Sequence, residues 1–99
     1  MKPVRFHPAA REELRYAVEF YESRAEGLGS DLQEEVEAAV RRIAELPFAG
    51  SPREISVRRK VLRRFPFTLV YQVREQSVVI VAVMHQRQRP GYWRERTDV

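Results

Sequence analysis

Basic and aromatic side chains gather between residues 85 and 96 of this 99-residue chain, and their types are the ones best suited to chemistry. They are His85, Arg87, Arg89, Tyr92, Trp93, Arg94 and Arg96. Planar guanidinium groups bind phosphate or carboxylate oxygens in pairs, and Tyr and Trp rings offer flat surfaces for stacking or interface contacts. Histidine exchanges protons near neutrality. The cluster predicts a surface for an anionic partner, with proton transfer at His85 as an alternative.

Each member of this cluster also has a purely structural interpretation. His85 follows an apolar run and can be a satisfied side chain at a strand end, Trp93 can cover an edge of the core, and Arg96 can be a solvated charge. A second basic run contains Arg58, Arg59, Lys60, Arg63 and Arg64. Charges of this kind also protect the exposed face of an edge strand from aggregation. Both interpretations stay open at this point.

The charge distribution favours an anionic partner for the second half of the chain. Residues 1–50 carry 7 Lys/Arg and 10 Asp/Glu, whereas residues 51–99 carry 11 and 4, so the halves have net charges of −3 and +7. A basic half of this kind attracts phosphate or acidic protein.

Composition and motifs exclude several common classes of site. The chain has no cysteine and two histidines, His7 and His85, so a disulfide framework and a thiolate or histidine metal site are not expected. It has no Gly-rich phosphate loop, no HExxH motif and no nucleophile elbow. The longest apolar run, residues 78–84, is too short to span a bilayer, and the amino terminus lacks a signal-peptide pattern. We therefore expect a single cytoplasmic domain, residues 1–99, without metal or cofactor.

The first half of the sequence predicts a short strand and two helices. Residues 3–6 alternate mildly and end before Pro8, which suits a first helical turn. Apolar residues then recur at helical spacing as far as Tyr21, while Tyr16 and Phe20 form a second, shorter stripe on nearly the opposite side. Residues 26–29 break this helix, and Ser30 with Gln33 resembles a capping box for a second helix ending before Pro47.

The second half predicts three strands. Residues 47–52 read as a loop, and residues 57–65, 67–74 and 77–85 are rich in β-branched and aromatic residues, with Glu75-Gln76 as the turn between the last two. The apolar run at 78–84 predicts a central strand covered on both faces. The fold class is therefore α+β, in the order β-α-α-β-β-β, with a helical hairpin packed on one face of a small twisted, mainly antiparallel sheet.

Residues 63–71 and 85–93 have the sequences RRFPFTLVY and HQRQRPGYW, and Arg96 follows them. Together with the FHPAA opening at residues 6–10 and the Leu46-Pro47 loop with Gly50, they resemble the RelE/ParE superfamily of bacterial toxins. The resemblance covers almost the whole chain and implies the same β-α-α-β-β-β fold. It also implies a toxin that causes growth arrest and forms a complex with a cognate antitoxin.

The superfamily has two functional branches, and this sequence resembles the ParE branch more. RelE-like nucleases cleave mRNA on the ribosome without a metal, and they carry an arginine where this chain has Thr68. Arg87 and Arg59 match two of their basic positions, but Trp93 stands where they use a tyrosine, and indole cannot transfer a proton as phenol can. ParE-like toxins inhibit DNA gyrase by binding it, so we expect a binding toxin rather than an enzyme.

Three interpretations follow from the resemblance. In the first, a ParE-like toxin contacts gyrase through Arg59, Lys60, Arg63, Arg64, Arg87, Arg89, Tyr92, Trp93 and Arg96. In the second, a ribosome-dependent endoribonuclease uses His85, Arg87 and Tyr92. In the third, a toxin without activity binds its antitoxin alone. All three predict an antitoxin that buries Tyr16 and Phe20, which could instead pack on the second helix, and that brings any operator DNA into the complex.

Overall fold

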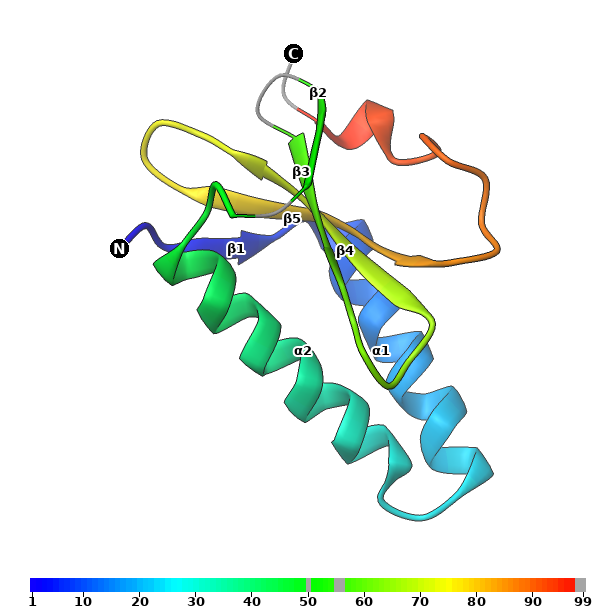
Figure 1. The fold of residues 1–99 in the computed structure, drawn as a ribbon. Coiled ribbons are helices and arrows are strands. Elements are labelled where there is room, and N and C mark those ends of the chain that lie inside the picture. Colours follow the sequence, from blue (N-terminus) through cyan, green and yellow to red (C-terminus); the bar gives the residue numbers. More distant parts are fainter. Residues whose placement is uncertain (50, 55–56, 98–99) are drawn as a thin grey trace.

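The computed structural model describes residues 1–49, 51–54 and 57–97 and confirms the predicted α+β fold. Its elements are β1 (Val4–Phe6), α1 (Pro8–Arg24), α2 (Leu28–Glu45), β2 (Ser51–Glu54), β3 (Val57–Val61), β4 (Phe67–Val73), β5 (Val78–His85) and a 3-10 helix (Arg94–Arg96). The two helices form a hairpin against one side of the sheet (Figure 1). No helix among the described residues is long and apolar enough to cross a membrane.

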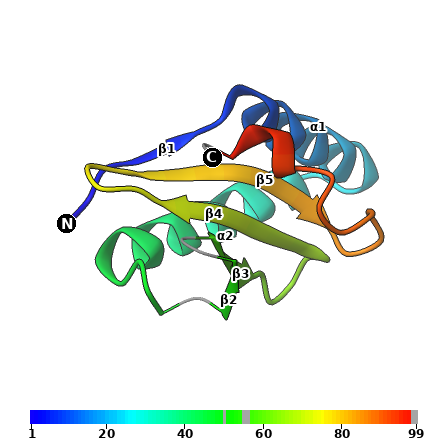
Figure 2. The ribbon, with the colours of Figure 1, turned by 90° about the horizontal axis from the view of Figure 1, so that it is seen from above.

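The strands form one twisted, mainly antiparallel sheet in the order β1-β5-β4-β3-β2. Figure 2 shows this order from above, with the helices behind the sheet and the carboxyl-terminal segment in front of β5. β1 runs parallel to β5 and pairs with residues 78–80, and the other neighbours are antiparallel. β2 was not predicted, because residues 47–52 were interpreted as a loop; Gly50 of that loop lies outside the described residues.

Both faces of β5 are buried, as the unbroken apolar run at residues 78–84 predicted. Both faces of β4 are buried as well. On one face, Leu69, Tyr71 and Ile80 pack with the buried stripes of α1 and α2. On the other face, Val70, Val81 and further aliphatic side chains pack against Trp93. The carboxyl-terminal segment is therefore the cover on the second face of the sheet, which the sequence did not identify.

The strands are shorter than the sequence suggested. β3 ends at Val61, and residues 62–66 form the turn before β4. The reversal between β4 and β5 does include Glu75 and Gln76, and it is closed by a 2.8 Å hydrogen bond from the Arg74 N–H to the Ser77 carbonyl oxygen.

The predicted capping box at Ser30 is wrong. α2 begins at Leu28, and its N-cap is Gly27, whose φ of 86° places it in the left-handed region that glycine adopts without strain. Glu22 of α1 supplies the cap instead. Its two carboxylate oxygens accept hydrogen bonds of 2.9 Å from the backbone N–H groups of Gly27 and Gly29. An anion at this position also suits the positive end of the helix dipole.

This cap predicts a pH-dependent contribution to stability. Hydrogen bonds from Gly27 and then Gly29 lower the pKa of Glu22 below its ordinary value of 4.5. A lowered folded-state pKa stabilises the fold at neutral pH, and the contribution disappears as pH falls below the ordinary carboxyl range. Thermal unfolding of Glu22→Gln should show a lower Tm than wild type at pH 7, with a difference that shrinks toward pH 3. Glu26→Gln is the control, and an equal loss of Tm in the two variants contradicts the assignment.

Candidate functional site

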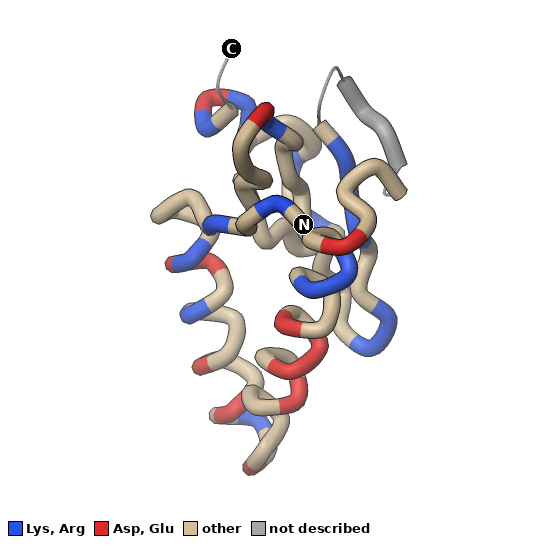
Figure 3. The backbone as a smooth tube through the Cα atoms, turned by 90° about the vertical axis from the view of Figure 1, so that its left-hand side faces the viewer, with Lys and Arg blue, Asp and Glu red and all other residues tan. Residues whose placement is uncertain are grey.

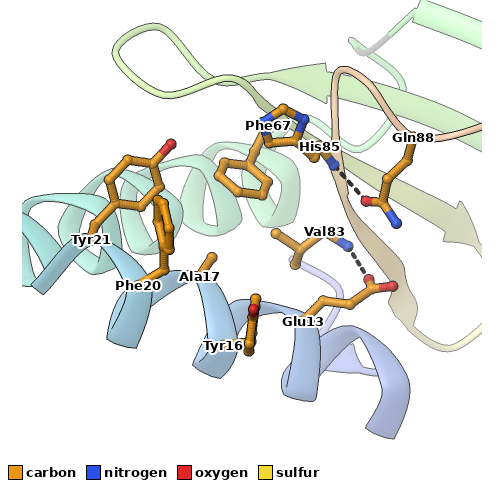
Figure 4. Close-up of a pocket in the computed structure, with 9 residues that line it drawn as sticks. All are labelled: Glu13, Tyr16, Ala17, Phe20, Tyr21, Phe67, Val83, His85 and Gln88. Atoms are coloured by element: carbon orange, nitrogen blue, oxygen red, sulfur yellow. Dashed lines mark hydrogen bonds between the residues drawn. The ribbon is translucent and has the colours of Figure 1, made fainter. Parts of the chain in front are cut away.

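A groove of about 380 Å³ lies between the exposed side of α1 and the adjoining ends of β4 and β5. Figure 4 shows α1 side chains along one wall and sheet and loop side chains along the other. The lining residues are Glu13, Tyr16, Ala17, Phe20, Tyr21, Phe67, Val83, His85 and Gln88. Small Ala17 leaves the space, the aromatic rings make one end apolar, and Glu13, His85 and Gln88 supply polar atoms. A cavity of this composition suits a binding surface for an apolar side chain with a polar flank.

Tyr16 and Phe20 are exposed in this groove, so the interpretation in which they pack on α2 is wrong. Tyr16 is 71% exposed and Phe20 is 41% exposed. Phe20 makes an edge contact with Tyr21 and lies under the Arg24 guanidinium at 4.7 Å. Tyr21 in turn contacts Phe67 of β4 edge-on, with 6.2 Å between ring centroids. These contacts place the second stripe beside the sheet, where a partner can reach it.

Glu13 of α1 joins the groove to the carboxyl-terminal segment. Its Oε1 accepts a 2.9 Å hydrogen bond from the Val83 N–H, and its Oε2 accepts one of 2.9 Å from the Tyr92 hydroxyl. The same oxygen forms a 3.0 Å ion pair with Arg96. Arg96 also donates a 3.0 Å hydrogen bond to the Val81 carbonyl oxygen. Glu13 and Arg96 thus satisfy backbone groups of β5 beyond the residues that pair with β1.

Glu13 was not among the predicted site residues, although its position carries a signal. Glu13 lies three residues after buried Ala10 and four before buried Ala17, which is the spacing of one helix face. A carboxylate on a buried stripe requires a partner.

Trp93 and Arg96 were predicted to face a target, and the structure places both differently. Trp93 is 2% exposed and packs against sheet residues that include Val57 and Met84. Arg96 is 19% exposed, because its guanidinium is held by Glu13 and lies 5.1 Å from the centre of the Tyr92 ring. The structural interpretation applies to Trp93, and Arg96 is an ion-paired side chain rather than a solvated charge.

Tyr92 is half-buried and hydrogen-bonded to Glu13. Burial first, and the neighbouring Glu13 carboxylate second, raise the pKa of the Tyr92 hydroxyl well above its ordinary value. A phenol in this state releases its proton less readily at neutral pH than a free tyrosine. The position of Tyr92 therefore favours a structural role over a catalytic one.

The structure separates the other members of the nuclease set. His85 contacts the Phe67 ring edge-on, and its Nδ1 accepts a 3.0 Å hydrogen bond from the backbone N–H of Arg87. The Arg87 side chain is exposed. Gln88 interacts with both His85 and Tyr92, but among the described residues no hydrogen bond or ring contact joins the Tyr92 hydroxyl to the imidazole. Thr68 is buried on β4, at 8% exposure.

The predicted basic surface divides between two faces and one end of the sheet. Arg59 pairs with Val70 and Lys60 pairs with Leu69, so their side chains project to opposite faces of β3. They do not form one surface. Arg63 and Arg64 are exposed on the turn between β3 and β4, and Arg87 and Arg89 are exposed on the loop after β5. These four arginines remain candidates for target contacts.

Comparisons with known proteins agree with this architecture. The family model described as "ParE toxin of type II toxin-antitoxin system, parDE" matches residues 4–90. Among solved structures, the chromosomal ParDE TA system from P. aeruginosa superimposes with a TM-score of 0.62 at 20% sequence identity, covering 86% of this chain and 96% of that chain. At this identity the structural likeness bears on the fold alone. A search of curated proteins gave no match. Because the family model spans most of the sequence, the chain belongs to the ParE toxins of type II toxin–antitoxin systems.

Proposed function

We propose that this ParE-family toxin acts in the cytoplasm by binding DNA gyrase and that a cognate antitoxin neutralises it. The gyrase target is inherited from the ParE branch that the sequence resembles. The state of Tyr92 is the observation that supports binding over mRNA cleavage. Its hydroxyl is held by Glu13. Its raised pKa makes the phenol a poor proton donor and leaves the phenolate, which would accept a proton, unpopulated at neutral pH. The exposed arginines of the two turns form the target-facing surface.

Purified toxin tests the target directly. A supercoiling assay with gyrase and plasmid should show inhibition and accumulated broken DNA, while mRNA from cells expressing the toxin should show no codon-phased cuts by primer extension. Codon-phased cuts without an effect on gyrase would instead establish the endoribonuclease. No growth arrest and no effect on either target would leave a protein that only binds its antitoxin.

The groove beside α1 is the proposed antitoxin site. Its exposed aromatic residues, Tyr16 and Phe20, provide the anchors that an amphipathic antitoxin segment buries in a helix-in-groove contact. The polar groups of Glu13, His85 and Gln88 lie toward the other end of the same groove and supply hydrogen-bonding partners there (Figure 4). Operator DNA enters such a complex through the antitoxin.

Replacing Tyr16 and Phe20 with alanine should weaken antitoxin binding by about a hundredfold, since anchoring aromatic residues carry much of the energy of an interface. The free energy of unfolding should fall by no more than about 2 kcal/mol, because Tyr16 is mostly exposed and Phe20 is partly exposed. Titration calorimetry with the antitoxin measures the effect. Glu19→Ala, an exposed position on α1 outside the groove, is the control. Unchanged affinity in the double variant, or unchanged hydrogen exchange at residues 9–24 on binding, places the antitoxin elsewhere.

A further inference from the structure

Two arginine-bearing turns lie side by side at one end of the sheet. Residues 62–66 connect β3 to β4, and residues 86–90 follow β5. Phe67 pairs with His85, and the Gln86 N–H donates a 2.9 Å hydrogen bond to the Pro66 carbonyl oxygen. These contacts place Arg63 and Arg64 of one turn and Arg87 and Arg89 of the other at the same end of the sheet. We call these four residues the arginine clamp.

The first turn of the clamp is fixed by a carboxylate of α2. The two oxygens of Glu35 accept hydrogen bonds from the successive backbone N–H groups of Arg63 and Arg64. The Leu62 N–H also donates a 3.0 Å hydrogen bond to the Phe67 carbonyl oxygen across the turn. The backbone is therefore held, while the two guanidinium groups extend toward solvent.

The second turn is fixed by its own side chains. The imidazole of His85 accepts a hydrogen bond from the Arg87 N–H, and the Gln88 amide oxygen accepts one of 2.8 Å from the His85 N–H. The Gln88 N–H closes the turn on the His85 carbonyl oxygen at 3.0 Å. Binding an anion at this end of the sheet thus requires little ordering of the backbone, which favours affinity.

The charge of the clamp is largely uncompensated. In the part of the chain that the structure describes, Arg64 forms a 3.3 Å ion pair with Asp31, whereas the guanidinium groups of Arg63, Arg87 and Arg89 have no carboxylate partner. Figure 3 shows that acidic residues concentrate on the helices, and basic residues are frequent along the strands and their turns. A groove of about 320 Å³ is lined mainly by residues 61–68, which include Arg63 and Arg64, and Gln86 is its lining residue from the second turn. Three or four exposed cations on turns with a held backbone suit a polyanion with several fixed charges.

Neither turn presents an exposed aromatic ring. Phe65 and Phe67 are 6% and 9% exposed. Single-stranded nucleic acids are bound largely by stacking bases on exposed rings, and an acidic peptide must lose chain entropy to match a fixed array of cations. Duplex DNA carries a rigid array of phosphates that needs no ordering and no stacking.

We propose that the arginine clamp binds the phosphate backbone of duplex DNA directly, without reading base sequence. The clamp is part of the target-facing surface, so this proposal rests on the proposed function. It adds contacts from the toxin to the DNA that gyrase holds. Guanidinium groups suit this role because their planar N–H donors match two phosphate oxygens at once.

Fluorescence anisotropy with a labelled duplex of about 20 base pairs and arbitrary sequence tests the clamp on DNA alone, at salt concentrations from about 50 to 200 mM. Arg63→Gln/Arg87→Gln should weaken binding by about tenfold per arginine and reduce the slope of log affinity against log salt by about 2. Arg5→Gln/Arg41→Gln removes the same charge from exposed positions on β1 and α2. This control should retain the slope and most of the affinity.

Equal loss of affinity in the two double variants overturns the clamp, because net charge alone would then explain binding. Equal or tighter binding of a single-stranded RNA of the same length, or of a poly-glutamate peptide, also overturns it. Gyrase inhibition is measured separately on the same proteins. Loss of the DNA effect with retained gyrase inhibition contradicts the clamp alone, whereas DNA binding without gyrase inhibition contradicts the proposed target alone.

Discussion

Replacing Trp93 with alanine should lower the free energy of unfolding by about 3–5 kcal/mol, the range for truncating a large buried aromatic side chain. The indole is 2% exposed and packs against Val70, Val79, Val81 and Met84 on the sheet face opposite the helices. Trp93 is the fully buried aromatic residue of that core. Alanine at this position would leave a cavity under the carboxyl-terminal segment. Urea unfolding followed by circular dichroism measures the change, with no use of indole fluorescence.

Trp93→Phe is the matched comparison. It keeps an aromatic ring and removes the indole Nε1, which is buried and has no hydrogen-bond partner among the residues that the structure describes. Trp93→Phe should therefore lower the free energy of unfolding much less than Trp93→Ala, by no more than about 2 kcal/mol. If alanine destabilises the protein no more than phenylalanine, the segment is not a cover for the core. Trp93 would then return to the role of an exposed target contact that the sequence suggested.

This expectation decides how toxicity measurements on the carboxyl-terminal segment are interpreted. A loss of toxicity in Trp93→Ala would report loss of the second core rather than loss of a target contact. Arg87 and Arg89 are exposed on the preceding loop, and their replacement removes charge without a cavity. These two positions therefore test the target surface cleanly.

The sequence predicted the fold well because its main elements carry strong periodic patterns. The buried stripe of α2 from Leu32 to Ile43 and the apolar run of β5 each have a single simple interpretation. β2 has no such pattern: its four residues, SPRE, include a proline, which is tolerated at sheet edges but does not indicate a strand. Pairing with β3 creates that strand, and pairing is not visible in a short polar segment.

The errors at the site have a common physical cause, which is contact between residues far apart in sequence. Ser30 and Gln33 form a sound local capping pattern, but the free N–H groups of Gly27 and Gly29 donate to Glu22 of the preceding helix. Trp93 and Arg96 looked like exposed recognition residues because their main partners lie on the sheet and on α1, outside their own segment of the chain. Tyr16 and Phe20 were identified correctly as a stripe, but the sequence could not show whether α2 or solvent faced them.

Glu13→Ala is expected to lower the free energy of unfolding by about 3 kcal/mol, since it breaks a buried charge pair and leaves polar groups unsatisfied. Glu13 and Arg96 side chains are 21% and 19% exposed. Without the carboxylate, the Val83 N–H and the Tyr92 hydroxyl lose their acceptor, and Arg96 keeps a largely buried charge. Thermal and urea unfolding measure the loss.

Glu12→Ala is the matched control one residue earlier. Its carboxylate is 66% exposed and pairs with Arg15 on the surface, so its removal should change the free energy of unfolding very little. Similar losses in the two variants would mean that the network adds no stability beyond a surface ion pair. A double variant, Glu13→Ala/Arg96→Met, isolates the pair: it should be more stable than Glu13→Ala alone, because it removes the charge that the single change leaves buried. A double variant less stable than the single one would show that Arg96 stabilises the segment through Val81 and Tyr92 without Glu13.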